Sequence, residues 1–340
     1  MQVRLAVVGL GNVGRRFLEL VQRKHKLIQE RFHLDLIVTA AGDTSGGAEY
    51  FRGLDVDTIL ELKRSGKGVA AYSQHGRGEM TMVDVVRSCH ADVLVENTLT
   101  NLTDGEPGLS TMREAIARKM HIATANKGPL VLAYQELFAL AAKQDVKILH
   151  SATVAGGLPV VNIGRRDLGA GTITKFEGIV NGTTNHILDA MSHGEAYEAA
   201  LKHMQELGIA EADPTLDVDG WDAANKLVIV ANACLRRPTT LKDLRVQGIR
   251  SITQQDLQNA QANGQVIKLV ARAVLKGDDY ELSVKPEWLD TSHPLAGVRG
   301  GYMAVLYESD INGQIFARIQ EDNPYPTAAG VLRDVINIYQ

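Results

Sequence analysis

The distribution of hydrophobic residues over the first half of the chain predicts a parallel α/β domain. Apolar runs with the length and near-continuous hydrophobicity of buried parallel strands occur at residues 5–10, 34–41, 93–96, 121–125 and 146–154. The segments between them carry hydrophobic residues at helical spacing, as in residues 13–21, 82–87, 112–119 and 130–143. This alternation predicts right-handed β–α–β units and a Rossmann-type, doubly wound sheet.

The pattern changes after about residue 150. The helical segments become longer and more polar, and an acidic loop at residues 211–219 interrupts them. Residues 266–275 and 280–289 have the pattern of two adjacent strands, and the Lys-Gly-Asp-Asp sequence between them is typical of a hairpin turn. We therefore predict a second domain of the α+β class.

A final amphipathic helix is predicted at residues 326–339, which could pack back on the first domain. The expected organisation is a nucleotide-binding domain over residues 1–149 and a substrate-binding, catalytic and dimerisation domain over 150–312. Residues 313–340 are expected to form a C-terminal segment that returns to the first domain.

Composition narrows the class of protein. A net charge of -4 and an aromatic content of 5% give no basic surface or stacking platform for nucleic acid, and no attraction to an anionic membrane. The chain shows neither a signal peptide nor an apolar stretch of membrane-spanning length. Two distant cysteines, Cys89 and Cys234, favour a reducing compartment. We expect a soluble, cytoplasmic protein.

The first strand is followed directly by the sequence Gly9-Leu-Gly11-Asn12-Val13-Gly14, which opens a predicted helix. This is the context of the dinucleotide-binding fingerprint, in which the glycines permit the turn, the approach of the pyrophosphate and close helix–strand packing. The helix N-terminus then presents free N–H groups to the phosphates. The alternative is a tight turn in a similar domain that binds nothing.

Two further residues lie where open α/β sheets bind their ligands, at the carboxyl ends of strands. Asp43 could accept hydrogen bonds from the adenosine ribose and so favour NAD, or it could simply begin a turn. Arg52 or Lys63 could instead meet a 2′-phosphate, so NAD and NADP both remain open. Lys127 could hold an anionic substrate group or a cofactor oxygen, or be a solvated lysine at a helix start.

The richest stretch in chemistry is residues 208–226, with five acidic residues between positions 211 and 222. Asp222 and Lys226 are four residues apart and share one face of a helix that continues as a fully apolar segment. A lysine at the mouth of a buried helix is a candidate proton donor and acceptor. The alternative is an ordinary surface pair, with Asp219 as the N-cap of the helix.

The small polar residues 181–185 before another helix suit either an N-cap or a polar substrate wall.

Taken in order along the chain, these motifs resemble the homoserine dehydrogenase family in its short form, which lacks a C-terminal regulatory domain. The resemblance rests on GLGNVG at 9–14, TANKGP at 124–129, ATVAGGLP at 152–159, GIVNGTTNHIL at 178–188 and GIAEADPTLDVDGWDAANK at 208–226. It implies NAD(P)-dependent interconversion of L-homoserine and L-aspartate 4-semialdehyde in threonine and methionine biosynthesis. It also implies a homodimer formed through the strands of the second domain.

The resemblance implies a role for each residue that matches a family motif. Lys226 matches the general acid and base, and Asp222 matches the carboxylate beside it. Glu211 matches a residue that contacts the substrate at its ammonium group, where Asp217 assists, and Lys127 matches a lysine near substrate and nicotinamide. Because a free lysine with a pKa of about 10.4 is a poor base at neutral pH, homoserine oxidation is expected to be faster at alkaline pH.

Further matches concern the cofactor and an ion. Thr98 and Gly208 match cofactor-side positions, and the backbone around Val154, Gly156 and Leu158 matches a monovalent-cation site, expected to hold Na⁺. The chain departs from the family at two places. Ser151 stands where the family often has an acidic residue, and Glu-Asp-Asn at residues 321–323 replaces a glycine-rich segment.

Two other functions are compatible with parts of the pattern. An aspartate-semialdehyde dehydrogenase also pairs two such domains but needs a thiolate nucleophile, and neither Cys89 nor Cys234 has a base motif beside it. A nucleotide-sensing module would keep the glycine motif but would have no use for Lys226 among its acids.

Overall fold

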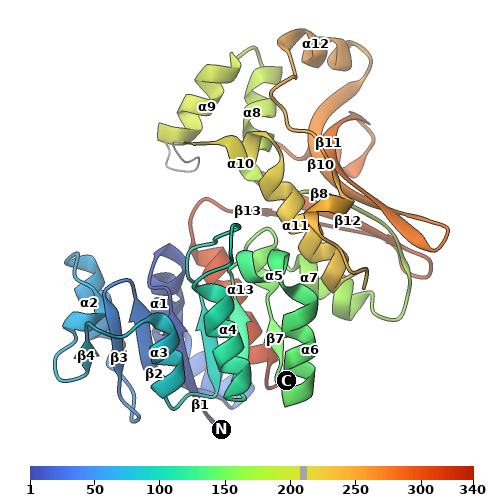
Figure 1. The fold of residues 1–340 in the computed structure, drawn as a ribbon. Helices are drawn as coiled ribbons and strands as arrows, with labels where there is room; N and C mark the ends of the chain where they lie inside the picture. Colours follow the sequence, from blue (N-terminus) through green and yellow to red (C-terminus); the bar gives the residue numbers. More distant parts are fainter. Residues whose placement is uncertain (207–212) are drawn as a thin grey trace. The chain divides into compact units, whose positions relative to one another are not determined.

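The structure is a computed structural model that describes residues 1–206 and 213–340 (Figure 1). The chain forms two compact units, the first made of Met1–Gly157 with Asn323–Gln340 and the second of Leu158–Asp322. The sequence pattern placed the two changes of domain near residues 150 and 313. The second boundary lies later than predicted, at residue 322, because residues 313–320 form a strand of the second unit.

The first unit contains a seven-stranded sheet in the order β4-β3-β2-β1-β5-β6-β7. Its core is parallel, as predicted, since β1 pairs with β2 and β5, and β6 pairs with β5 and β7. The parallel strands are β1 (Gln2–Val8), β2 (Asp35–Asp43), β5 (Val93–Glu96), β6 (His121–Thr124) and β7 (Ile148–Leu149). The antiparallel edge strands β3 (Gly46–Glu49) and β4 (Gly76–Arg77) were not predicted.

Helices cover both faces of this sheet. Figure 1 shows α3 (Met82–Ser88), α4 (Gly108–Ala117) and α6 (Tyr134–Gln144) on one face, with α1 (Asn12–Phe32) and α13 (Tyr325–Asn337) on the other. The unit also contains the helices α2 (Val56–Arg64) and α5 (Gly128–Leu132). Helix α13 packs against α1, and Phe17, Val331 and Val335 are fully buried in one core with Leu5 and Val7 of β1.

Two predicted elements are corrected. The expected strand at residues 146–154 is only β7, and residues 151–153 form a 3-10 turn whose Ser151 backbone N–H donates to the Asp334 carboxylate of α13 instead of a strand. The expected helix at 130–143 is divided into α5 and α6 at Ala133, whose φ of -140° and ψ of 31° lie outside the helical region.

The second unit is built on a six-stranded sheet in the order β13-β12-β8-β10-β11-β9. The predicted hairpin is confirmed, because β10 (Gln265–Lys276) and β11 (Asp279–Asp290) pair in antiparallel register along their whole length. The other strands are β8 (Ile173–Ile179), β9 (Arg245–Val246), β12 (Tyr302–Ser309) and β13 (Gly313–Gln320), with only β9 running parallel to its neighbour.

Six α-helices accompany the described part of this sheet: α7 (Val160–Asn162), α8 (Gly182–Ser192), α9 (Tyr197–Glu206), α10 (Thr215–Val218), α11 (Trp221–Ala233) and α12 (Gln254–Ala262). Helix α11 (Figure 1) packs against β10 and β11. Its residues from Leu227 to Ala231 are fully buried. Within residues 1–206 and 213–340, no helix has the length and hydrophobicity needed to cross a membrane.

Candidate active site

The glycine motif forms the turn between β1 and α1. Gly9 has a φ of +85°, and a Cβ there would lie 2.3 Å from the carbonyl carbon of Asn97. A Cβ on Gly14 would lie 2.0 Å from the Gly9 carbonyl oxygen, whereas one on Gly11 would meet nothing within 4 Å. Gly9 and Gly14 are therefore required by packing, while Gly11 leaves its backbone open to an approaching group. Helix α1 starts at Asn12 and Val13, with no acidic residue in its first turn to oppose an anion.

Asp43 is the last residue of β2, and its carboxylate is already held by neighbouring groups. It accepts hydrogen bonds from Lys63 Nζ (2.6 Å), Ser45 N (2.9 Å) and Oγ (2.5 Å), and Val69 N (3.2 Å). Burial raises the pKa of Asp43, but these hydrogen bonds outweigh it and the net pKa lies below the usual value. Asp43 thus fixes the turn after β2 and also pairs with Lys63.

A buried polar network lies where β5 and β6 end. The Glu96 carboxylate, which is fully buried, accepts hydrogen bonds from the Thr98 backbone N–H (2.9 Å) and from Thr124 Oγ1 (3.1 Å). Asn126 Nδ2 donates to Thr98 Oγ1 at 3.1 Å. Burial raises the pKa of Glu96, and the hydrogen bonds from Thr98 and Thr124 oppose this.

This network positions two of the predicted residues. Thr98 is part of it, and Lys127 follows Asn126 at the N-cap of α5, with its backbone N–H 3.4 Å from Thr100 Oγ1. Sequence reasoning missed Glu96 and Asn126. The available signal was an acidic residue that directly follows the apolar run of β5.

In the second unit, Lys226 lies at the centre of a compact polar cluster. Its Nζ donates to Asp222 Oδ2 and to the Val180 carbonyl oxygen, each at 2.6 Å. Asn181 Nδ2 donates to Asp222 Oδ2 (2.8 Å) and to Asp217 Oδ1 (2.7 Å). The side chains of Lys226 and Asp222 are only 12% and 16% exposed, so this is not a solvated surface pair.

The two carboxylates of the cluster influence each other. Burial raises the pKa of Asp217, and the negative charge of Asp222 raises it further, while Asn181 and Lys226 act in the opposite direction. One ammonium group therefore sits beside two carboxylates of which Asp217 retains a proton more readily than a free aspartate. Such a site suits proton transfer and the binding of a cationic substrate group.

Asn181 confirms the N-cap considered for residues 181–185, and its side chain also belongs to the cluster around Lys226. Its Oδ1 accepts from Thr184 N at 2.9 Å and caps α8, while its Nδ2 binds the two carboxylates. The N-cap of α11 is Gly220, and Asp219 instead pairs with Arg250. The remaining predicted residues of this motif, Gly208 and Glu211, lie outside the described residues.

The loop predicted to hold a cation packs against α13. Ser151 donates from N and Oγ to the Asp334 carboxylate, both at 2.6 Å, and burial raises the pKa of Asp334 to about 6. Val154 and Gly156 belong to this loop of the first unit, while Leu158 begins the second unit. Among the described residues, no group of three or more His, Cys, Asp or Glu side chains is placed to hold a metal ion.

Neither cysteine is placed to act as a nucleophile. Burial raises the pKa of the Cys89 and Cys234 thiols to about 12, so both are protonated at neutral pH. A reaction through an acyl-thioester is therefore disfavoured.

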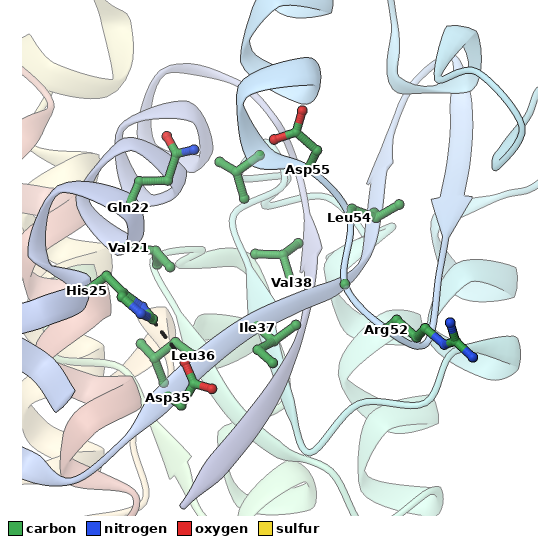
Figure 2. Close-up of a pocket in the computed structure, with 12 residues that line it drawn as sticks. Val21, Gln22, His25, Asp35, Leu36, Ile37, Val38, Arg52, Leu54 and Asp55 are labelled. Carbon is green, nitrogen blue, oxygen red and sulfur yellow. Dashed lines mark ion pairs between the residues drawn. The ribbon is translucent and has the colours of Figure 1, made fainter.

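Figure 2 shows a pocket of the first unit at the amino-terminal end of β2. It lies between α1 and the segment before α2, and His25 points toward Asp35 across it at 3.8 Å. Because open parallel sheets bind ligands at the carboxyl ends of their strands, this pocket is at the opposite end of β2 from Asp43 and is not part of the candidate site.

Comparison with known proteins gives a consistent result. The sequence model described as homoserine dehydrogenase matches residues 159–336. The chain is 37% identical to the homoserine dehydrogenase of Methanocaldococcus jannaschii over 98% of both chains. It is 35% identical to the NAD(+)-dependent homoserine dehydrogenase of Pseudomonas canavaninivorans, covering 100% of this chain and 97% of that one.

Solved structures show the same similarity. A putative homoserine dehydrogenase from Archaeoglobus fulgidus has a TM-score of 0.89 and 35% identity over 99% of both chains. A hyperthermophilic archaeal homoserine dehydrogenase in complex with NADPH has a TM-score of 0.85 and 26% identity, covering 99% of this chain and 97% of that one.

The glycine turn supports a prediction with a matched pair of variants. Gly14→Ala places a methyl group against the Gly9 carbonyl and should lower the free energy of unfolding by about 1–3 kcal/mol. In Gly11→Ala the added methyl group meets no neighbour, so the free energy of unfolding should change by less than about 0.5 kcal/mol. The same variant should weaken dinucleotide binding. Urea unfolding and a fluorescence titration with NADH and NADPH measure the two effects. Equal stability of the two variants would contradict this account of the turn.

Proposed function

The chain belongs to the homoserine dehydrogenase family, and we propose on that premise that Lys226 is the general acid and base of its reaction. The reaction is the NAD(P)-dependent interconversion of L-homoserine and L-aspartate 4-semialdehyde. The observation that carries the assignment is the hydrogen-bonded cluster of Lys226 with Asp222, Asn181 and Asp217. When bound, NAD(P) supplies the hydride acceptor or donor at its nicotinamide ring.

The position of the Lys226 amine fits a proton-transfer role. An ammonium group has three protons, and in the described residues two of them point at Asp222 and the Val180 carbonyl. We propose that the third N–H bond of Lys226 points toward the substrate oxygen. In homoserine oxidation Nζ accepts the hydroxyl proton, and in aldehyde reduction it returns a proton to the alkoxide oxygen.

The acidic residues are proposed to divide two tasks. Asp222 holds Lys226 in place, and Asn181 fixes Asp222 in turn. Asp217 is proposed to assist Glu211 in binding the ammonium group of the substrate, because opposite charges stabilise each other at close range. Holding both ends of homoserine in one geometry lowers the entropic part of the barrier.

The first unit is proposed to bind the dinucleotide along the carboxyl ends of its strands. Gly9, Gly11, Asn12, Val13 and Gly14 form the pyrophosphate turn, which fits because a Cβ at Gly11 would meet no neighbour and the N-terminus of α1 is free of acids. Thr98 and Lys127, at the ends of β5 and β6, are proposed to lie beside the nicotinamide end, together with Gly208.

We propose that the Asp43–Lys63 pair favours NAD over NADP. The Asp43 carboxylate lies at the end of β2, where open α/β sheets bind the ribose, and a ribose hydroxyl would replace one of its four present donors. Lys63, a candidate ligand for a 2′-phosphate, is bound to Asp43 at 2.6 Å. A 2′-phosphate would meet the carboxylate and would have to compete with it for the lysine.

A homodimer through the second unit is also proposed. Strand β13 is an eight-residue edge strand of the sheet, and Phe316 on one of its faces is 41% exposed. A long edge strand with an exposed aromatic residue is normally covered by another element or another chain. A second copy of the same strand is the simplest partner, because a two-fold axis pairs identical surfaces.

Lys226→Ala should lower kcat for homoserine oxidation by about 10²–10⁴-fold, because the hydroxyl proton then has no acceptor. Wild-type oxidation should accelerate from pH 7 to pH 10, since an amine accepts a proton only when it is neutral. Initial rates across this pH range measure both effects, with Lys202→Ala as the control because that side chain is 75% exposed. Full activity of Lys226→Ala, or a flat pH profile, would refute the assignment.

The cofactor assignment is tested by the ratio of kcat/KM for NADP to that for NAD. The wild type should prefer NAD, and Asp43→Ala should shift the ratio toward NADP by about tenfold or more because it removes a repelling charge and releases Lys63. Lys63→Ala should give no such shift. Asp35→Ala, at the other end of β2, is the control, and an unchanged ratio in Asp43→Ala would exclude this role.

Sedimentation equilibrium tests the proposed dimer. The wild type should have the mass of two chains, and Phe316→Glu should shift it toward one because a charge is placed in the interface. Phe51→Glu, at a 64% exposed phenylalanine of the first unit, should leave the mass unchanged. A monomeric wild type would disprove the proposal.

A further inference from the structure

The loop between β7 and α7 is where the family resemblance implies a monovalent cation, held by the backbone carbonyls of Val154, Gly156 and Leu158. One of these carbonyls already accepts a hydrogen bond, and a second lies close to α13. The Leu158 oxygen accepts a hydrogen bond from Val160 N at 2.8 Å. The Gly156 oxygen faces α13 so closely that a Cβ added to Gly330 would lie 3.1 Å from it.

The same loop is bound by a cationic side chain of α13. Arg333 Nη2 donates to Ser151 Oγ at 3.0 Å, and Nη1 donates to the Gly157 carbonyl at 3.2 Å. The planar guanidinium therefore joins the beginning of the turn to its end, six residues later. A monovalent cation at this turn would supply positive charge and bind backbone carbonyls. The Arg333 guanidinium does both.

The charges around the loop are balanced without an ion. The family resemblance implies an acidic residue at position 151, but this chain has Ser151 there, so that position contributes no negative charge. The carboxylate comes instead from Asp334, which is 1% exposed and accepts both the N–H and the hydroxyl of Ser151. Arg333 directly precedes it in the chain and supplies the opposite charge.

We propose that the Arg333 guanidinium replaces the monovalent cation in this protein. The residues of the loop do not fit a Na⁺ site: the side chain at position 151 is neutral, and a second cation would be repelled by Arg333. The β7–α7 turn is therefore ordered by side chains of α13, and stability and activity do not depend on Na⁺ or K⁺. This inference depends on the proposed function only for its activity readout.

The test compares thermal unfolding in NaCl, KCl and choline chloride at equal ionic strength. The wild type should give the same Tm in all three salts, and so should Arg333→Lys, which keeps the positive charge. The double variant Ser151→Glu with Arg333→Ala recreates an acidic loop without its own cation. Its Tm should be higher in Na⁺ or K⁺ than in choline, because an ion that binds only the folded state stabilises it.

Homoserine oxidation measured in the same salts gives the second readout. Wild-type rates should be equal in Na⁺, K⁺ and choline, whereas those of the double variant should rise with Na⁺ or K⁺. A wild-type Tm that is specifically higher in Na⁺ or K⁺ than in choline would overturn the proposal. Absence of homoserine oxidation in every salt would count against the proposed function alone, because the Tm comparison does not require activity.

Discussion

The candidate site of the second unit depends on one amide group, the Nδ2 of Asn181, which donates to both Asp217 and Asp222. Burial raises the pKa of Asp217 and the negative charge of Asp222 raises it further, so the two carboxylates repel each other, and the shared donor reduces this repulsion. Asp222 and the Val180 carbonyl then orient Lys226. The end of β8, the start of α8 and helices α10 and α11 are thus tied to the geometry of a single side chain.

Both units place several residues of the candidate site within three residues of the end of a strand, whereas Asp222 and Lys226 lie in α11. Gly9 follows β1, Thr98 follows β5 and Lys127 follows β6, while Val180 and Asn181 follow β8 in the other sheet. A strand fixes the position of its last residue through hydrogen bonds on both sides, and the backbone beyond it is free to turn toward a ligand. The sheets therefore hold in place polar residues that lie just beyond the ends of their strands.

The sequence predicted what depends on local pattern. Hydrophobic runs identified the parallel strands and the β10–β11 hairpin, and four-residue spacing placed Asp222 beside Lys226. Local sequence pattern could not reveal contacts between residues far apart in the chain, such as Asn181 with Asp217 or Ser151 with Asp334. Strand β3 was missed because its Gly-Gly-Ala-Glu sequence lacks the β-branched and aromatic residues that indicate strands. The helix break at Ala133 likewise has no Gly or Pro to mark it.

The replacement of an ion by Arg333 changes what controls the loop after β7. A bound ion exchanges with solvent, so the order of the turn would depend on salt concentration. A guanidinium carried by α13 cannot leave, and the same helix places Val331 and Val335 in the core of the first unit. Folding of that core therefore brings Arg333 and Asp334 to residues 151–157. The return of the chain to its first unit after residue 322 is what makes this possible.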